Sequence, residues 1–170
     1  IFATIATPKG YGAPDARWDT SRICEFAEIL GFYGLQYWYT YQVSVLGLGP
    51  IWQSGNEAIK QRTARLLEEG GIFAFGLSEK EHGADIYSTS MTLTPQADGT
   101  YLASGRKYYI GNANKAAIVS TFGKIAGTGE YVFFAVDSQH PKFELVKTTV
   151  APRPAPAAVR PHPVACWHPR

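Results

Sequence analysis

Residues 75–85 read FGLSEKEHGAD, and residues 105–112 read GRKYYIGN. In the first stretch an apolar strand that carries the hydroxyl of Ser78 runs into an acidic turn, followed by a glycine, a small residue and an aspartate. In the second stretch a short strand with two tyrosines leads into a turn at Gly111 and Asn112. Each stretch therefore places polar or aromatic groups where a strand ends.

The sequence around these stretches alternates between apolar and polar residues, which predicts β-strands. Turn signals such as Asp98-Gly99 and His140-Pro141 separate the strands. The expected strands cover residues 72–78, 89–95, 100–104, 107–110, 117–122, 131–136 and 143–146. Many short strands at this spacing predict an antiparallel barrel or sandwich over residues 72–150.

Residues 1–71 are predicted to be a helical segment. The turn-rich residues 1–19 indicate a loop, and a helical apolar period begins at Thr20, with Ser21 as its N-cap. This period continues until two glycines and Pro50 are expected to stop it.

A second helical period follows over residues 54–69. Ser54 and Glu57 form an S-x-x-E capping box, and Gly70 and Gly71 are expected to end the helix.

Composition excludes several classes of protein. With 45% apolar and 18% charged residues, the chain can bury a core and is not expected to be disordered over most of its length. Residues 23–46 are long enough to span a membrane, but Glu25 and Glu28 would be costly in lipid, so no membrane span is expected.

Residues 151–170 differ from the rest of the chain. They contain six of its eleven prolines and no acidic residue, which predicts a disordered tail. His162, Cys166 and His168 make a poor metal site, so no metal is expected. Residues 1–144 carry 12 basic and 14 acidic side chains, with no basic cluster that predicts nucleic-acid binding.

Cys24 and Cys166 are too few and too far apart in sequence for a disulfide scaffold. Reduced thiols and a cytoplasmic location are therefore expected. The first residues also lack the charged and apolar regions of a signal peptide.

Together, the two quoted stretches resemble the acyl-CoA dehydrogenase/oxidase superfamily of FAD-dependent enzymes. Members of that superfamily show an L/V-T-E-P-x-x-G-S-D segment followed by G-x-K-x-W-I-T-N-G. The resemblance covers about residues 30–147 and implies an α+β fold. In this fold the end of an N-terminal helical domain precedes an antiparallel β-barrel or sandwich, and the C-terminal helical bundle of the family is absent.

The resemblance implies α,β-dehydrogenation of an acyl-CoA thioester, with hydride transfer to FAD, as part of fatty acid metabolism. It also implies electron-transfer flavoprotein or oxygen as the electron acceptor, and a homo-oligomer at full length. Acyl-CoA oxidase or flavin monooxygenase activity on the same architecture is an alternative.

The family's functional residues carry over by position. The implied FAD-binding residues are Phe75, Leu77, Ser78, Gly83, Tyr109, Ile110 and Gly111. Ala84 is the implied substrate-binding residue, and Asp85 is expected to hold the turn. Fixed donors near the flavin favour its reduction, because negative charge builds up on the ring as it accepts a hydride.

Three positions depart from the family pattern. Lys80 replaces the common proline, and Ala84 replaces a serine that approaches the substrate. Gly111 stands where dehydrogenases usually present a threonine hydroxyl to the flavin. Because oxidases also tend to lack this hydroxyl, the choice between dehydrogenase and oxidase stays open.

The family's catalytic base is a glutamate of the C-terminal bundle, and no glutamate here matches it. Glu79 and Glu81 are expected in a solvated turn, and Lys107 at a solvated strand end. The chain is therefore expected to be truncated. A non-catalytic remnant or partner subunit that binds FAD weakly is an alternative.

Loss of the bundle is also expected to expose apolar side chains of the helical segment and to favour self-association. These side chains are Leu30, Phe32, Tyr37, Trp38 and Tyr41.

Overall fold

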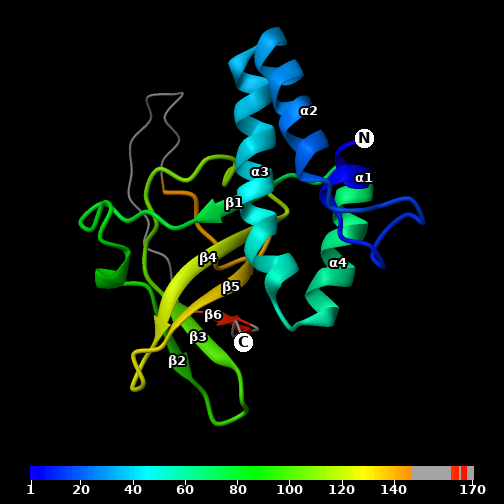
Figure 1. Cartoon of the computed structure of the whole chain (residues 1–170). Coiled ribbons are helices and arrows are strands. Elements are labelled where there is room, and N and C mark those ends of the chain that lie inside the picture. Colours follow the sequence, from blue (N-terminus) through cyan, green and yellow to red (C-terminus); the bar gives the residue numbers. More distant parts are fainter. Residues whose placement is uncertain (147–161, 165, 168–170) are drawn as a thin grey trace.

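The computed structural model describes residues 1–146, 162–164 and 166–167 and shows helices packed against one mixed β-sheet (Figure 1). The helices are α1 (Phe2–Ala6), α2 (Thr20–Tyr33), α3 (Leu35–Gln53) and α4 (Glu57–Glu68). The strands are β1 (Phe73–Gly76), β2 (Thr92–Pro95), β3 (Tyr101–Ser104), β4 (Ile118–Ile125), β5 (Tyr131–Asp137), β6 (His162–Val164) and β7 (Cys166–Trp167), with a 3₁₀ turn, η1 (Ile86–Ser88), before β2. The predicted α+β order, helices first and strands second, is confirmed.

Helices α2 and α3 form an antiparallel hairpin that projects beyond the sheet (Figure 1). The side chain of Asp19 caps α2 by accepting a hydrogen bond from the backbone N–H of Arg22, so Ser21 is not the N-cap but the second residue of the helix. Gly34 ends α2, where its N–H donates to the carbonyl of Leu30, and α3 begins at the next residue.

At the tip of this hairpin, Phe32 and Tyr37 are exposed, as predicted, whereas Leu30 and Trp38 are half-buried. The prediction is wrong for Tyr41. Its ring is buried, and its hydroxyl donates to the backbone carbonyl of Ile23 at 3.0 Å.

The predicted stop of α3 at Pro50 is wrong, because the helix continues to Gln53. Proline removes one intrahelical hydrogen bond, to the carbonyl four residues earlier, at Leu46. The Leu46 side chain is 44% exposed on this part of the helix. The last two turns of α3 bury Leu48 and Ile51 completely, and this packing outweighs the tendency of Pro50 to end the helix.

Asn56, rather than Ser54, is the N-cap of α4, since its side chain accepts from the backbone N–H of Ile59 at 3.1 Å. Ser54 instead ends α3, and its hydroxyl donates to the carbonyl of Ile51. Beyond the C-terminus of α4, Gly70 has a φ of 83°, in agreement with the predicted glycine stop.

Strand β4 organises the sheet, which follows the order β6-β3-β2-β4-β5-β7. β5 pairs with β4 in antiparallel fashion along its length, whereas β1 and β2 both run parallel to β4, β1 near its start and β2 at its end. The predicted purely antiparallel domain is therefore corrected to a mixed sheet, which is not closed in the described residues. Residues 107–110 and 143–146, predicted as strands, lie outside regular structure.

β6 and β7 lie in the stretch predicted to be disordered, and they pair with β3 and β5. The disordered tail stays a prediction, since the remainder of 151–170 lies outside the described residues. The division of the chain at residues 71 and 150 stays a prediction.

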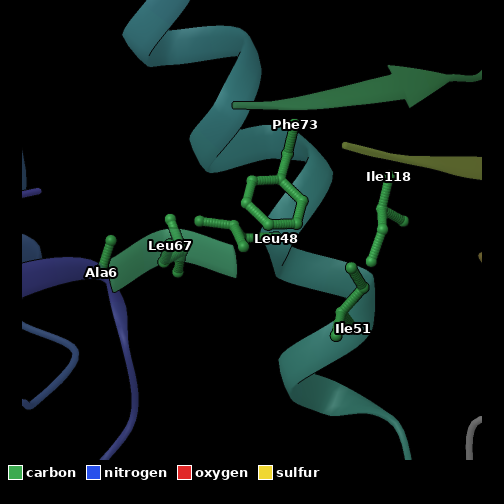
Figure 2. Packing of buried hydrophobic residues seen from close by; sticks show 6 residues of the cluster. All are labelled: Ala6, Leu48, Ile51, Leu67, Phe73 and Ile118. Carbon is green, nitrogen blue, oxygen red and sulfur yellow. The ribbon is translucent and has the colours of Figure 1, made fainter. Parts of the chain in front are cut away.

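The main core lies where α3 crosses the sheet. Figure 2 shows Leu48 and Ile51 of α3 facing Phe73 of β1 and Ile118 of β4. Leu67 of α4 and Ala6 of α1 complete the cluster, which explains why residues 2–6 form a helix rather than the predicted loop. This core fixes the orientation of β1, and the first candidate site segment follows β1 directly.

Candidate functional site

The first candidate segment leaves the sheet at the carboxyl end of β1. Leu77 is half-buried, whereas Ser78 is exposed. No hydrogen bond of the Ser78 hydroxyl to another described residue is present in the structure. An open hydroxyl is thus presented just past the end of a strand that is itself held in the core.

The second candidate segment lies directly against the first. The backbone N–H of Tyr108 donates to the carbonyl of Ser78 at 2.9 Å. The ammonium of Lys107 donates to the carbonyl of Leu77 at 3.0 Å. The two stretches quoted at the start of the sequence analysis are therefore neighbours in space, as their resemblance to the family pattern implied.

A buried ion pair lies beneath this junction. The Lys107 Nζ and Glu79 Oε1 atoms are 2.7 Å apart, and the two side chains are only 8% and 5% exposed. Glu79 also accepts hydrogen bonds from Thr89, from the backbone N–H and hydroxyl of Ser90, and from the backbone N–H of Met91. The carboxylate is therefore bound on both oxygens by the segment that leads into β2.

These contacts keep Glu79 ionised. Burial by itself raises the pKa of this carboxyl, but hydrogen bonds from Lys107, Ser90 and Thr89 outweigh burial and lower the pKa to about 2. Burial lowers the pKa of Lys107, and the adjacent carboxylate opposes that effect. At neutral pH the pair is charged, and neither group is free to serve as an acid or a base.

The expectations that Glu79 lies in a solvated turn and Lys107 at a solvated strand end are therefore wrong. The residues stand 28 positions apart in the chain, and nothing local to either of them reveals the pairing. A usable signal existed in the family pattern, because Glu79 in the first segment and Lys107 in the second stand at the positions of that pattern's own Glu and Lys.

Two exposed tyrosines border the junction. Tyr108 is 51% and Tyr109 73% exposed, with ring centroids 5.6 Å apart. Tyr109 has a φ of 62°, a left-handed conformation that is uncommon for an aromatic residue. That conformation prevents the predicted strand over 107–110 and directs the backbone into the turn at residues 111–115.

Gly111 reaches the helical layer. A Cβ atom at this position would lie 2.6 Å from the Tyr39 hydroxyl oxygen, so the side chain of α3 occupies the space that a residue larger than glycine would need. The next residue, Asn112, donates from its side-chain amide to the carbonyls of Thr40 at 2.8 Å and Phe73 at 3.0 Å. Sequence reasoning did not find Tyr39, because its partner lies 72 positions away.

The predicted substrate side of the site is an open loop. Gly83 has a φ of 42°, and both Gly83 and Ala84 are exposed. Leu77, His82 and Gly83 line a shallow depression in the surface beside Glu79. Asp85 holds this loop as expected, since its carboxylate accepts from the hydroxyl and the backbone N–H of Ser88.

Two predicted cofactor residues take part in packing. The Phe75 ring stacks on that of Phe133, with centroids 5.5 Å apart. Ile110 packs against Ala74 and Val119 in a separate small cluster. Their contacts with a cofactor stay predictions, as do those of the other predicted site residues.

None of the helices in the described part of the chain combines the length and the apolar character that a membrane span requires. The same part of the chain contains no group of three or more side chains that could together bind a metal ion.

A helical layer that packs on an open mixed sheet, with a polar and aromatic junction at the strand ends, defines the class of fold. No model of a known protein family matches the chain. A curated relative, the short-chain specific acyl-CoA dehydrogenase of Megasphaera elsdenii, is 40% identical over 74 residues, which are 43% of this chain and 19% of the relative.

Solved structures agree with this relationship. Butyryl-CoA dehydrogenase from Megasphaera elsdenii superposes with a TM-score of 0.71 and 29% identity, over 83% of this chain and 38% of the other. An acyl-CoA dehydrogenase complexed with FAD from Bacillus anthracis gives 0.62 and 25%, over 83% and 25% of the two chains. A FAD complex of PigA, at 20% identity and a TM-score of 0.72, shows the shared fold alone.

These similarities confirm the resemblance to the acyl-CoA dehydrogenase superfamily, in its N-terminal helical and middle β-domains. The chain spans about a fifth of the curated relative and less than half of each of these solved structures.

Proposed function

We propose that this chain supplies a FAD-binding face of an acyl-CoA dehydrogenase-like flavoprotein. The reaction is α,β-dehydrogenation of an acyl-CoA thioester, in which a hydride passes to the flavin. The observation that carries the proposal is the junction of the two segments. There the backbone N–H of Tyr108 donates to the carbonyl of Ser78, which brings a residue with a free hydroxyl next to the exposed Tyr108 and Tyr109.

The residues present fit a flavin. An isoalloxazine ring is planar and largely apolar, with hydrogen-bonding atoms along its edges, and it needs an aromatic or aliphatic surface with a few fixed donors. Tyr109 and Ser78, which are exposed, and Leu77, which is half-buried, offer that combination of groups. No buried charge of this site is left unpaired to oppose the ring, because Glu79 and Lys107 neutralise each other.

When bound, FAD supplies the hydride acceptor. The contribution of this chain is to orient the ring and to place the Ser78 hydroxyl at its edge as a donor. Leu77 and the tyrosine rings exclude water from the ring face. The loop at Gly83 and Ala84 leaves room for the thioester, since neither residue carries a bulky side chain.

The base that removes the α-proton is proposed to lie outside residues 1–146. Among the carboxylates near the site, Glu79 is engaged by Lys107, and Asp85 by Ser88. Glu81 is exposed and lies 3.8 Å from the ammonium of Lys80. No carboxylate at this face of the described residues is assigned as the base, and the second candidate is therefore a non-catalytic remnant or partner subunit that binds FAD weakly.

The finer assignments belong to the same proposal. The substrate is an acyl-CoA, the class that appears in the names of the similar proteins, and the electron acceptor is electron-transfer flavoprotein or oxygen. Oxidase or flavin monooxygenase chemistry remains an alternative, because Gly111 brings no hydroxyl to the ring. We also propose a cytoplasmic protein of fatty acid metabolism that forms a homo-oligomer at full length.

A titration of the purified chain with FAD, followed by flavin fluorescence and visible absorption, tests the proposal. Ser78→Ala is expected to weaken binding by about threefold to tenfold, the usual contribution of one neutral hydrogen bond. Ser104→Ala, which removes an exposed hydroxyl at the end of β3, is the matched control and is expected to change nothing. Equal affinity of the wild type and the Ser78 variant would contradict the assigned role.

Addition of an acyl-CoA to the FAD-loaded chain without oxygen separates the two candidates. Bleaching of the flavin absorbance would support the dehydrogenase and would require a base from an unassigned residue or from a partner. Binding of FAD without bleaching is the result expected of the non-catalytic candidate.

A further inference from the structure

We propose that the buried Glu79–Lys107 ion pair is a positioning device that holds residues 77–78 and 108–111 in one fixed arrangement. The importance of that arrangement for a ligand rests on the proposed function, whereas the positioning itself follows from the geometry of the described residues. Neither member of the pair is assigned any contact with the flavin or the substrate.

The lysine connects three separate pieces of chain. Its ammonium donates to the carbonyl of Leu77 at 3.0 Å, to Glu79 Oε1 at 2.7 Å and to the hydroxyl of Thr89 at 3.3 Å. An ammonium group has three protons, so its donor capacity is fully used. Because Lys107 directly precedes Tyr108, fixing the lysine also fixes the backbone that donates to Ser78.

The glutamate anchors this assembly to the sheet. Its Oε2 atom accepts from the Ser90 backbone N–H at 2.8 Å and from the Ser90 hydroxyl at 2.6 Å, and its Oε1 atom accepts from the Met91 backbone N–H at 3.3 Å. Met91 is buried and directly precedes β2. The two site segments are thereby tied to the rigid start of a strand.

Hydrogen bonds of the β-sheet do not fix the second site segment. Residues 105–111 belong to no strand or helix, and Tyr109 within them has a left-handed backbone. Apolar packing is non-directional and cannot by itself select one orientation of an exposed loop. Hydrogen bonds to charged groups are directional and strong, which gives the pair this role.

A role in positioning also explains why the pair is ionic. The desolvation cost of a buried ion pair often cancels its attraction, so its replacement by neutral side chains of similar shape leaves stability nearly unchanged or higher. What such a replacement removes is the fixed geometry. The two effects can therefore be measured separately.

The experiment compares the whole chain with the double variant Glu79→Gln/Lys107→Met by amide hydrogen exchange and thermal unfolding. We expect the Tyr108 amide to exchange about tenfold faster or more, because the charge-assisted bonds that hold its loop are lost. The exchange rates of the amides in β4 and β5, and the midpoint of thermal unfolding, should stay close to the wild-type values. Arg62→Met/Asp137→Asn, which removes the more exposed pair between α4 and β5, is the matched control and should leave Tyr108 unchanged.

Unchanged exchange at Tyr108 in a folded double variant would overturn the proposal. Faster exchange throughout β4 and β5 would do the same, because the pair would then hold the whole fold. If the double variant does not fold, the same exchange measurement on Glu79→Gln alone tests the proposal, since glutamine keeps the shape of the side chain and can still accept from Ser90.

An FAD titration of the same proteins separates the two proposals. If the wild type binds no FAD, the proposed function fails, and the exchange measurement still decides the positioning role. If the wild type binds FAD, the double variant is expected to bind FAD with an affinity that is lower by about tenfold or more, because the site is no longer preorganised. Equal FAD affinity in the double variant would show that the pair does not position the ligand-facing segments.

Discussion

Asn112 illustrates how much a single polar side chain contributes to this site. It adopts a φ of 62° and donates to backbone carbonyls of both α3 and β1, so it joins the helical layer to the strand at the turn after Gly111. Ser44 supports the same point by accepting from the Phe73 backbone N–H at 3.1 Å. Asparagine suits the position twice, because it tolerates the left-handed region and carries the amide donor.

Asn112→Ala is therefore expected to lower the free energy of unfolding by about 1–3 kcal/mol, through unsatisfied carbonyls and backbone strain. Urea denaturation measures the loss. Asn112→Gly tolerates the left-handed backbone, so its effect isolates the part of the lost unfolding free energy that comes from the hydrogen bonds. Asn114→Ala, in the same turn but exposed, should be neutral, and an equal effect at both positions would refute this account.

Acid should act on the site through Glu79. Its pKa is about 2 in the folded chain and 4.5 ordinarily, so the folded state binds this proton less readily than the unfolded state does. The resulting stability is fully present above pH 4.5 and is lost as the pH falls through about 2.

The difference in unfolding free energy between the wild type and Glu79→Gln is therefore expected to shrink over that interval, by no more than about 3 kcal/mol. Denaturation series at several acidic pH values give this difference. A difference that stays constant between pH 5 and pH 2 would show that Glu79 is not the titrating group.

Among the elements, α3 and β1 approach each other so closely that a glycine of the helix lies against the backbone of the strand. A Cβ atom on Gly47 would lie 2.6 Å from the backbone oxygen of Ala74, so the helix touches the strand through its own backbone. The Ser120 hydroxyl of β4 donates to the Gly47 carbonyl at 2.5 Å across the same contact. This contact sets the distance between β1 and α3, and with it the position of Leu77 and Ser78, which follow β1.

Gly47→Ala is expected to destabilise the fold by about 1–3 kcal/mol or more, because the clash is with backbone atoms that cannot rotate away. Gly49→Ala is the control on the same helix, where nothing lies within 4 Å of the added Cβ. That change should be neutral or stabilise by up to about 1 kcal/mol through helix propensity. Thermal unfolding of both variants measures the two effects. A destabilisation by Gly47→Ala no larger than that by Gly49→Ala would contradict the packing argument.

At the level of the whole molecule, the α2–α3 hairpin exposes a large apolar tip. Phe32, Tyr33 and Leu35 are 85%, 73% and 72% exposed, next to one another at the turn between the helices. An apolar patch of this kind is unusual on a monomeric protein surface. The chain is therefore expected to self-associate through this tip.

Light scattering as a function of concentration tests this expectation. Phe32→Ser/Leu35→Ser should shift the distribution toward the monomer, with little change in unfolding temperature, because the removed side chains are hardly buried. Leu145→Ser/Val146→Ser, which changes two other exposed apolar residues, is the control. A monodisperse wild-type monomer at moderate concentration would rule out the self-association.

Local sequence patterns alone predict several features of the fold. The capped amphipathic period located α4 to within a few residues, alternation located β4 and β5, and two short motifs indicated the superfamily. The same local reasoning placed a stop at Pro50, a strand at residues 107–110 and a solvated Glu79, and each of these is different in the folded chain.

Two of these differences, the continuation of α3 past Pro50 and the burial of Glu79, have the same physical reason. The partners that settle them lie far away in sequence: the sheet against which Leu48 and Ile51 pack, and the lysine 28 positions beyond Glu79. A charged side chain is buried only where its counter-charge and donors are already in place. Periodicity and propensity report on neighbours along the chain, whereas the burial of Glu79 and Lys107 arises only when two loops of the folded protein meet.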